Sequence, residues 1–132
     1  MILLLDTNAF IWWVSDDVRL GRKTRTDIAN PANDVYISNL SMFECGIKAK
    51  LGKLKIDFDA VDKEVSEGRL LELRFDTLVA RQLVSQQDLP QSDPFDAAIV
   101  AQAVAKHMTL VTSDYHILES SIIGLYTLDA KR

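Results

Sequence analysis

The sequence predicts an α/β fold in which a mainly parallel sheet is sandwiched between layers of helices, formed by one domain over residues 1–132. Short apolar runs with the character of buried strands alternate along the chain with longer helical stretches. The first run, Ile2–Leu5, is apolar at every position and too short for a useful helix, which is typical of a strand buried on both faces. No linker, repeat or low-complexity tract divides the chain, whose length is common for one domain.

After this first strand, the apolar and Trp-rich residues 9–14 indicate a helix that starts beside Asp6. A second helix is expected over residues 18–30, and the turn-forming residues 30–34 end it. The β-branched and aromatic residues 35–38 indicate the second strand.

The next helix is expected to start at Ser41, because Ser41-Met42-Phe43-Glu44 matches the Ser-x-x-Glu capping box, and to run to Gly52. A polar helix over residues 59–68 ends at a glycine. A third short strand over 70–73 and a helix over 77–87 follow.

The last part of the chain opens with a strong helix start, because Asp93 precedes a proline and proline suits the first helical position. This helix carries Phe95, Ile99 and Ala103 at a spacing of four. A buried strand over 109–112, a short helix or turn from Tyr115, and a last strand near residues 124–128 complete the predicted fold.

Charge and cysteine content restrict the class of protein. The net charge of −4 argues against a generic nucleic-acid coat, but not against an enzyme that holds acidic groups in a pocket. The single cysteine, Cys45, cannot form an internal disulfide, which fits a reducing compartment. The opening apolar run is too short for a membrane span and is broken by Asp6, so we expect a cytoplasmic protein without membrane contact.

Four acidic residues, each at or near a helix start, are the candidate catalytic and metal-binding residues: Asp6, Glu44, Asp96 and Asp114. Each has an ordinary explanation, because acids at a helix start can cap it and gain about 0.3–1 kcal/mol from the helix dipole. Their joint placement is less ordinary. Two of them end buried parallel strands, and the other two lie where helices meet the same edge of the sheet.

Such a cluster predicts a hard cation. Two carboxylates about 5 Å apart repel by roughly 3 kcal/mol at an effective dielectric near 20, and a bound cation relieves that repulsion. Oxygen ligands without a histidine or cysteine partner select Mg²⁺ or Mn²⁺, and His107 and His116 form no familiar ligand spacing with Cys45. Ions held in this way suit phosphoryl chemistry, because they activate water and neutralise the phosphate.

Hydroxyl and amide groups beside the acids are candidates for orienting the carboxylates, although turn and cap formation explains them equally well: Thr7, Asn8, Thr112 and Ser113. Two basic clusters, at residues 19–25 and 48–55, have a similar ambiguity. They could contact phosphate, or they could be a solvated helix face and a favourable helix C-terminus.

The ordered set of motifs resembles a family. It comprises Leu5-Asp6-Thr7-Asn8, Glu44 after the second strand, Asp93-Pro94-Phe95-Asp96 before Ile99-Val100-Ala101-Gln102-Ala103, and Leu110-Val111-Thr112-Ser113-Asp114. Across essentially its whole length the chain is similar to PIN-domain ribonucleases, and more closely to the VapC toxins of bacterial toxin–antitoxin pairs. One departure is Gln91, where close relatives often carry histidine.

The resemblance implies a three-layer α/β/α PIN-like domain and endonucleolytic hydrolysis of single-stranded or loop RNA with one or two Mg²⁺ or Mn²⁺ ions. It assigns the metal site to the four acids above. Asp93 is adjacent to them, and we interpret it as a helix cap and a candidate for a supporting role. The resemblance further implies a homodimer and inhibition by an antitoxin protein, for which Trp12 and Trp13 could form part of an interface, although at least one of them is expected in the core.

Two other functions are compatible with parts of the pattern. Aspartyl-phosphate phosphatases also begin with a strand that ends in aspartate, but they resemble Asp-x-Asp, and here Asn8 takes the second place. A non-catalytic PIN-like binding module would be expected to have lost one of the acids, and all four are present.

Overall fold

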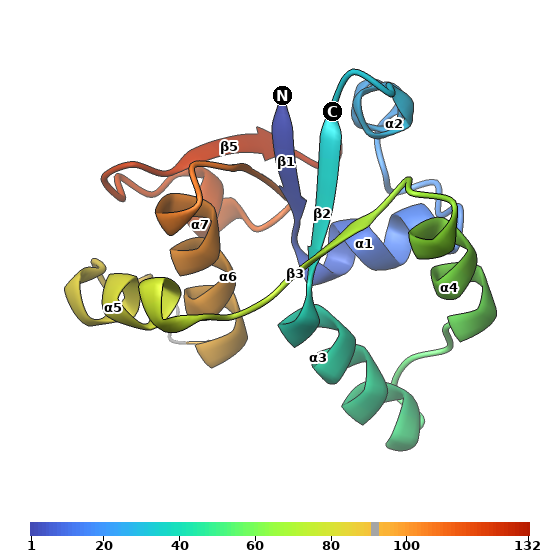
Figure 1. Cartoon of the computed structure of the whole chain (residues 1–132), viewed down its shortest axis with the longest axis horizontal. Helices are drawn as coiled ribbons and strands as arrows, with labels where there is room; N and C mark the ends of the chain where they lie inside the picture. Colours follow the sequence, from blue (N-terminus) through green and yellow to red (C-terminus); the bar gives the residue numbers. More distant parts are fainter. Residues whose placement is uncertain (91–92) are drawn as a thin grey trace.

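Five parallel strands form the centre of the computed structural model, which describes residues 1–90 and 93–132 (Figure 1). The strands are β1 (Ile2–Leu5), β2 (Asp34–Ser38), β3 (Leu71–Leu73), β4 (Thr109–Thr112) and β5 (Tyr126–Asp129). They lie in the order β3-β2-β1-β4-β5, and each neighbouring pair is parallel. The prediction of a mainly parallel sheet is therefore confirmed.

The register aligns the carboxyl ends of the three central strands. Leu5, the last residue of β1, pairs with Ile37 of β2 and with Val111 of β4. Whatever follows these strands therefore lies at one edge of the sheet. Because successive side chains of a strand point to opposite faces, Leu3 and Leu5 belong to one hydrophobic core and Leu4 to the other.

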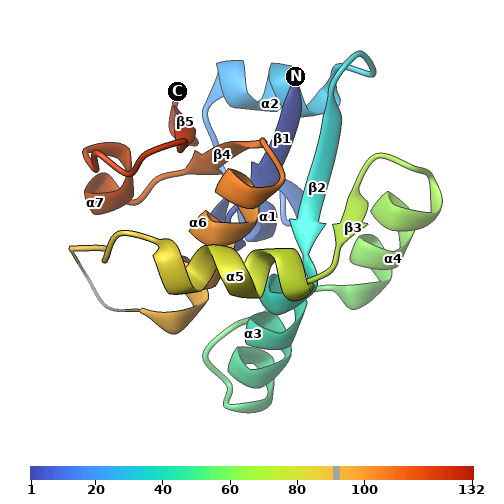
Figure 2. The same ribbon diagram turned by 60° about the vertical axis from the view of Figure 1, so that its left-hand side comes forward.

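Helices cover both faces of the sheet in the part of the chain that is described. They are α1 (Thr7–Val14), α2 (Arg22–Ala29), α3 (Asn39–Lys50), α4 (Phe58–Ser66), α5 (Thr77–Ser85), α6 (Pro94–Ala105) and α7 (Tyr115–Leu118). Figure 1 shows α1 to α4 on one side of the strands and α5 to α7 on the other, and Figure 2 shows α5 and α6 on the near side. This is the predicted three-layer α/β/α arrangement.

Both cores are built from side chains that the sequence marks as apolar. Phe10 and Trp12 of α1 are buried with Leu3 and Leu5 in the first core, so one of the two tryptophans is a core residue as expected. Ile99 of α6 packs with Leu4 in the second core. In the described residues, no helix has both the length and the apolar character that a membrane crossing requires.

The capping box predicted at Ser41 is wrong. Helix α3 begins at Asn39, directly after β2, and its cap is Ser38, whose hydroxyl accepts from the backbone N–H of Leu40 at 3.1 Å. Ser41 is therefore a buried residue inside the helix. The chain needs no linker between β2 and α3, so the cap of the helix lies three positions earlier than the motif suggests.

Other boundaries differ by a few residues. Helix α2 starts at Arg22 rather than at residue 18, because the backbone turns at Leu20, whose N–H donates to Asp17. Strand β5 starts at Tyr126 rather than near residue 124, because Gly124 adopts a φ of 80° that a strand does not allow. Gln91, the departure from the family pattern, lies outside the described residues.

Candidate functional site

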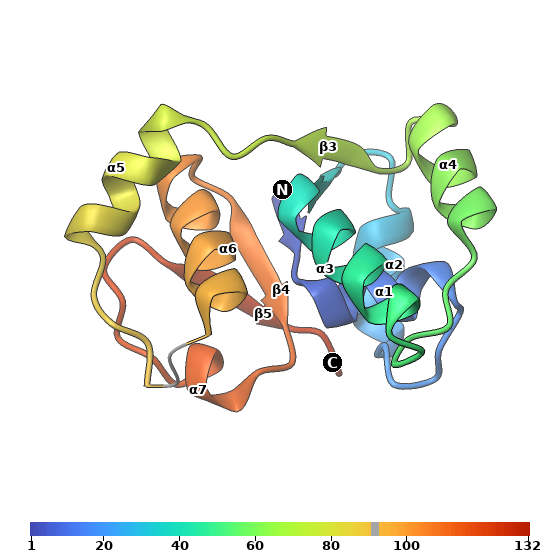
Figure 3. The same cartoon turned by 90° about the horizontal axis from the view of Figure 1, so that it is seen from below.

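A small polar cavity of about 160 Å³ opens at the carboxyl edge of the sheet. Its lining residues come from four separate segments: Asp6, Thr7, Asn8, Glu44, Lys48, Asp93, Asp96 and Asp114. All four acids singled out in the sequence are among them. Seen from below in Figure 3, α3 and α6, which pack against each other, lie side by side at this end of the sheet.

Asp6 and Asp114 are both helix caps and cavity residues. The backbone N–H of Asp6 continues the sheet by donating to Val111 at 2.9 Å, and its carboxylate accepts from the N–H of Ala9 at 2.8 Å. Asp114 follows β4 and accepts from the N–H of His116 at 2.8 Å. The capping explanation is thus confirmed for two side chains that also line the cavity, and capping fixes where each carboxylate points.

The amino terminus of α6 supplies two further carboxylates. Asp93 is the N-cap, as predicted, and accepts from the N–H groups of Phe95 at 2.8 Å and Asp96 at 3.2 Å. Asp96 lies in the first turn of the helix, where it is half-buried, whereas Asp93 is exposed. Proline at the first helical position removes one backbone donor that the cap would otherwise have to satisfy.

Glu44 is held by two side chains, those of Thr7 and Lys48. Its Oε1 accepts from the Thr7 hydroxyl at 3.2 Å, and its Oε2 lies 2.7 Å from the Lys48 ammonium. The Thr7 hydroxyl in turn lies 3.0 Å from that of the buried Ser41. These contacts tie the end of β1 to α3 and turn the Glu44 side chain toward the cavity, leaving it only 16% exposed.

The carboxylates lie close enough to affect one another. Burial raises the pKa of Asp6 from 3.8 to about 6, and the charges of Asp114 and Glu44 act in the same direction. Hydrogen bonds from Thr112 and from the N–H of Ala9 oppose this rise. Burial also raises the pKa of Asp96 to about 6, with the charges of Asp93, Asp114, Asp6 and Glu44 adding to it. The cavity thus concentrates negative charge that is costly without a counter-ion.

The donor set fits a hard divalent cation in chemical type. The lining offers carboxylate, hydroxyl and amide oxygens, and it includes no described histidine or cysteine. Within residues 1–90 and 93–132, however, no three acidic, histidine or cysteine side chains already converge in a metal-holding arrangement. Both Glu44 oxygens are engaged, one by Thr7 and the other by Lys48, so an ion that binds Glu44 would share this carboxylate with these partners or displace one of them.

The hydroxyl and amide residues that were candidates for orienting the carboxylates do not all line the cavity. Thr7 and Asn8 line it, and Thr112 contributes a hydrogen bond to Asp6 while accepting from the N–H of Asp114 at 3.0 Å. Ser113 is absent from the described lining. The sequence predicts no site role for Ser41, and Lys48 enters only as part of the basic cluster at residues 48–55. Lys48 was recognisable from its spacing of four after Glu44, which places the two side chains on one helix face.

The side chains of the two basic clusters make different contacts. In the first, Arg19 forms an ion pair with Asp17 and lies 5.1 Å above the Trp12 ring, and Arg25 pairs with Asp16. These arginines are thus already engaged by neighbouring acids, which favours the solvated-face interpretation. In the second cluster, Lys48 reaches the acidic cavity.

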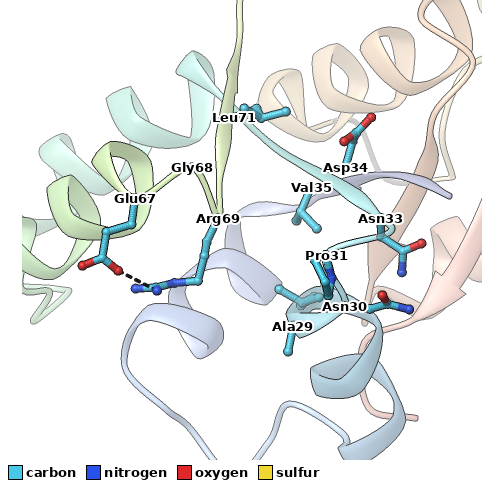
Figure 4. Close-up of a pocket in the computed structure, with 11 residues that line it drawn as sticks. Ala29, Asn30, Pro31, Asn33, Asp34, Val35, Glu67, Gly68, Arg69 and Leu71 are labelled. Atoms are coloured by element: carbon cyan, nitrogen blue, oxygen red, sulfur yellow. Dashed lines mark ion pairs between the residues drawn. The ribbon is translucent and has the colours of Figure 1, made fainter.

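A second cavity, of about 260 Å³, lies away from the acids. It is formed at the starts of β2 and β3, where Asp34 and Leu71 line it, and Figure 4 shows Arg69 paired with Glu67 at its mouth. The Arg69 Nη1 and Glu67 Oε2 atoms are 2.6 Å apart. This cavity lies at the opposite end of the parallel strands from the acidic one, and the acids that line it do not include any of the four candidates.

Comparisons with known proteins agree on a family and a fold. The model of the PIN-domain family matches residues 3–120. Among solved structures, VapBC2 from Rickettsia felis bound to a promoter DNA fragment is 19% identical, with a TM-score of 0.67 over 97% of this chain and 98% of that one. DNA-bound VapBC from Salmonella typhimurium is also 19% identical, with a TM-score of 0.67 over 98% of each chain.

VapBC-1 from nontypeable Haemophilus influenzae is 17% identical, with a TM-score of 0.64 over 100% of both chains. At these identities the likeness concerns the fold. Among curated proteins, none matched the chain by sequence.

Proposed function

Because the chain belongs to the PIN-domain family, we propose that it is a metal-dependent endoribonuclease and the toxin of a VapBC-type toxin–antitoxin pair. The observation that carries the proposal is the meeting of Asp6, Glu44, Asp96 and Asp114 in one cavity at the carboxyl edge of a parallel sheet. The structural likeness to VapBC complexes supports a VapC-type toxin within the family.

The four carboxylates would hold Mg²⁺ or Mn²⁺, with Asp6 and Asp96 as principal ligands and Glu44 and Asp114 completing the set. When bound, such an ion activates water, neutralises the scissile phosphate and stabilises the leaving oxygen. The chain itself contributes pre-organisation, because backbone N–H groups fix the carboxylates of Asp6 and Asp114. The Thr7 hydroxyl orients Glu44 in the same way.

Charge explains why the reaction would depend on metal. An RNA phosphate is anionic, and the cavity presents five carboxylates against one ammonium group among its described lining residues. Substrate would therefore be repelled from the metal-free cavity. Burial is the main cause of the raised pKa values of Asp6 and Asp96, and the neighbouring carboxylates raise them further, a repulsion that a divalent cation would offset.

An exposed apolar stripe beside the cavity supports a protein partner. Phe43, Ile47 and Leu51 recur every four residues along α3 and into its C-cap, and they are 61%, 41% and 60% exposed. Exposed apolar groups gathered in this way mark interaction surfaces. We assign this surface to the antitoxin, since structural neighbours of the chain come from toxin–antitoxin complexes. A homodimer and a cytoplasmic location remain predictions from the sequence.

Cleavage of a fluorescently labelled single-stranded RNA tests the proposed activity. Wild-type protein is expected to cut the RNA with Mg²⁺ or Mn²⁺ and to lose activity in EDTA. An Asp96→Asn variant purified in parallel controls for contaminating ribonuclease and is expected to be inactive. Equal cleavage with and without chelator, or by both proteins, would contradict the mechanism. No cleavage by well-folded wild type on any RNA would favour the non-catalytic binding module.

A further inference from the structure

The cavity contains one cationic group among its described lining residues, the ammonium of Lys48. It lies 2.7 Å from Glu44 Oε2, and the two residues are four positions apart on α3. An exposed pair with this spacing is a common helix feature worth about 0.3–0.5 kcal/mol. Spacing alone would therefore make Lys48 an ordinary surface residue.

Three observations distinguish this pair from an ordinary one. The Glu44 side chain is only 16% exposed and faces a cavity that four other carboxylates line. The Lys48 side chain is 43% exposed but still lines the same cavity. Asp93, the cap of a different helix, lines this cavity too, so the ammonium lies among carboxylates from two helices.

The pair also bears on how a metal ion would reach Glu44. Thr7 and Lys48 together engage both oxygens of Glu44. Asp6, Asp93 and Asp114 instead accept backbone hydrogen bonds at helix starts. Of these contacts, only the one with Lys48 comes from a cation, so it is the one in which a divalent cation could take over the neutralisation of the carboxylate.

We propose that Lys48 is an internal counter-ion that competes with the divalent cation: its ammonium neutralises Glu44 in the metal-free protein and releases that carboxylate when a metal ion binds. The inference rests on the proposed metal site and concerns how the charge of Glu44 is neutralised when no metal ion is bound. Lys48 acts through Glu44 and is therefore a positioning residue.

The test measures Mg²⁺ binding by calorimetry and melting temperature in EDTA for wild type, Lys48→Met, Lys48→Arg and Lys50→Met, at pH 8. Lys50 is the matched control, because it is exposed on the same helix and forms no ion pair within the described part of the chain. Methionine keeps the apolar stem and removes the charge in both cases.

Lys48→Met is expected to bind Mg²⁺ roughly two- to fivefold more tightly than wild type, the range that a partly exposed ion pair supports. It should also melt at a lower temperature in EDTA and gain more from added Mg²⁺, since the carboxylates have lost their counter-ion. Lys48→Arg should restore wild-type affinity, and Lys50→Met should match wild type throughout.

Equal Mg²⁺ affinity in wild type and Lys48→Met would overturn the proposal. If that variant bound Mg²⁺ normally but cleaved RNA poorly, Lys48 would be a phosphate contact instead. A wild-type protein that binds no Mg²⁺ or Mn²⁺ would overturn the metal site itself. That result is distinct from failure of the Lys48 inference alone, in which metal binds but Lys48 does not affect it.

Discussion

The hydroxyl of Thr7 donates to Glu44 across 3.2 Å, joining the residue that follows Asp6 to a carboxylate 37 positions later in the chain. The same hydroxyl lies 3.0 Å from that of Ser41, which has no exposed surface. Thr7 therefore links two walls of the acidic cavity, and its loss should be measurable in stability and in activity.

Thr7→Val is expected to destabilise the protein by about 1–3 kcal/mol, because it leaves a buried hydroxyl without this partner at nearly constant side-chain volume. Ribonuclease activity should fall as Glu44 loses its orientation. Thr7→Ser keeps the hydroxyl and is the control. Urea unfolding of the three proteins measures the effect, and a valine variant as stable as the serine variant would argue against the link.

Asp6→Asn separates a metal site from a simple cap. Asparagine caps as well as aspartate, so a cap alone predicts a nearly neutral change. With acids clustered, the variant should instead be more stable than wild type in EDTA by roughly 1–3 kcal/mol, at an effective dielectric near 20. Mg²⁺ should raise the melting temperature of the wild type more than that of the variant, and activity should be lost.

The matched control for this substitution is Asp57→Asn. Asp57 is an exposed cap of α4 that accepts from the N–H groups of Asp59 and Ala60 and is not part of the acidic cavity. The effect of Asp57→Asn on the melting temperature should therefore be the same with and without Mg²⁺. Identical melting temperatures for Asp6→Asn and wild type, with and without metal, would mean that Asp6 is only a helix cap.

The raised pKa of Asp6 gives the metal-free protein a defined pH dependence. Burial moves this pKa from 3.8 to about 6, so between these values the folded state retains a proton that the unfolded state has released. The contribution of Asp6 protonation to the free energy of unfolding is therefore fully present below about pH 4. It is lost as the pH rises to about 6.

The stability of wild type relative to Asp6→Asn should therefore fall by about 3 kcal/mol across this interval, at about 1.4 kcal/mol per pKa unit. Comparing the two proteins in EDTA cancels the titrating groups that do not interact with Asp6. Denaturant titrations at intervals between pH 4 and pH 7 measure the difference. A constant difference, or one that grows in favour of the wild type, would contradict a buried Asp6 carboxylate.

Alanine substitutions at two glycines are expected to have opposite effects on stability. A Cβ at Gly21 would overlap the backbone of Lys131 and Arg132, so Gly21→Ala must displace the carboxyl-terminal segment and should cost about 1–3 kcal/mol. A Cβ at Gly46, inside α3, would meet nothing within 4 Å, so Gly46→Ala should stabilise by up to about 1 kcal/mol. Thermal melts of both variants in one buffer check the contrast.

Local signals in the sequence were sufficient for the strands, the helices and the edge at which the acids gather. Runs such as Ile2–Leu5 and the Asp93-Pro94 helix start depend on residues a few positions apart, and both occur as predicted. Parallel strands then bring their carboxyl ends to one edge whatever the details of packing. The location of Asp6 and Asp114 followed from this rule.

Only the tertiary structure decided how the groups at that edge interact. Ser41 fits a capping motif, yet it lies inside α3 and faces Thr7, because β2 runs into the helix without a linker. Lys48 looks like a helix-terminal lysine, yet it reaches the cavity. The physical reason is that rotation of α3 about its axis determines which side chains face Thr7. That rotation is fixed by packing against residues more than thirty positions away, which no local pattern encodes.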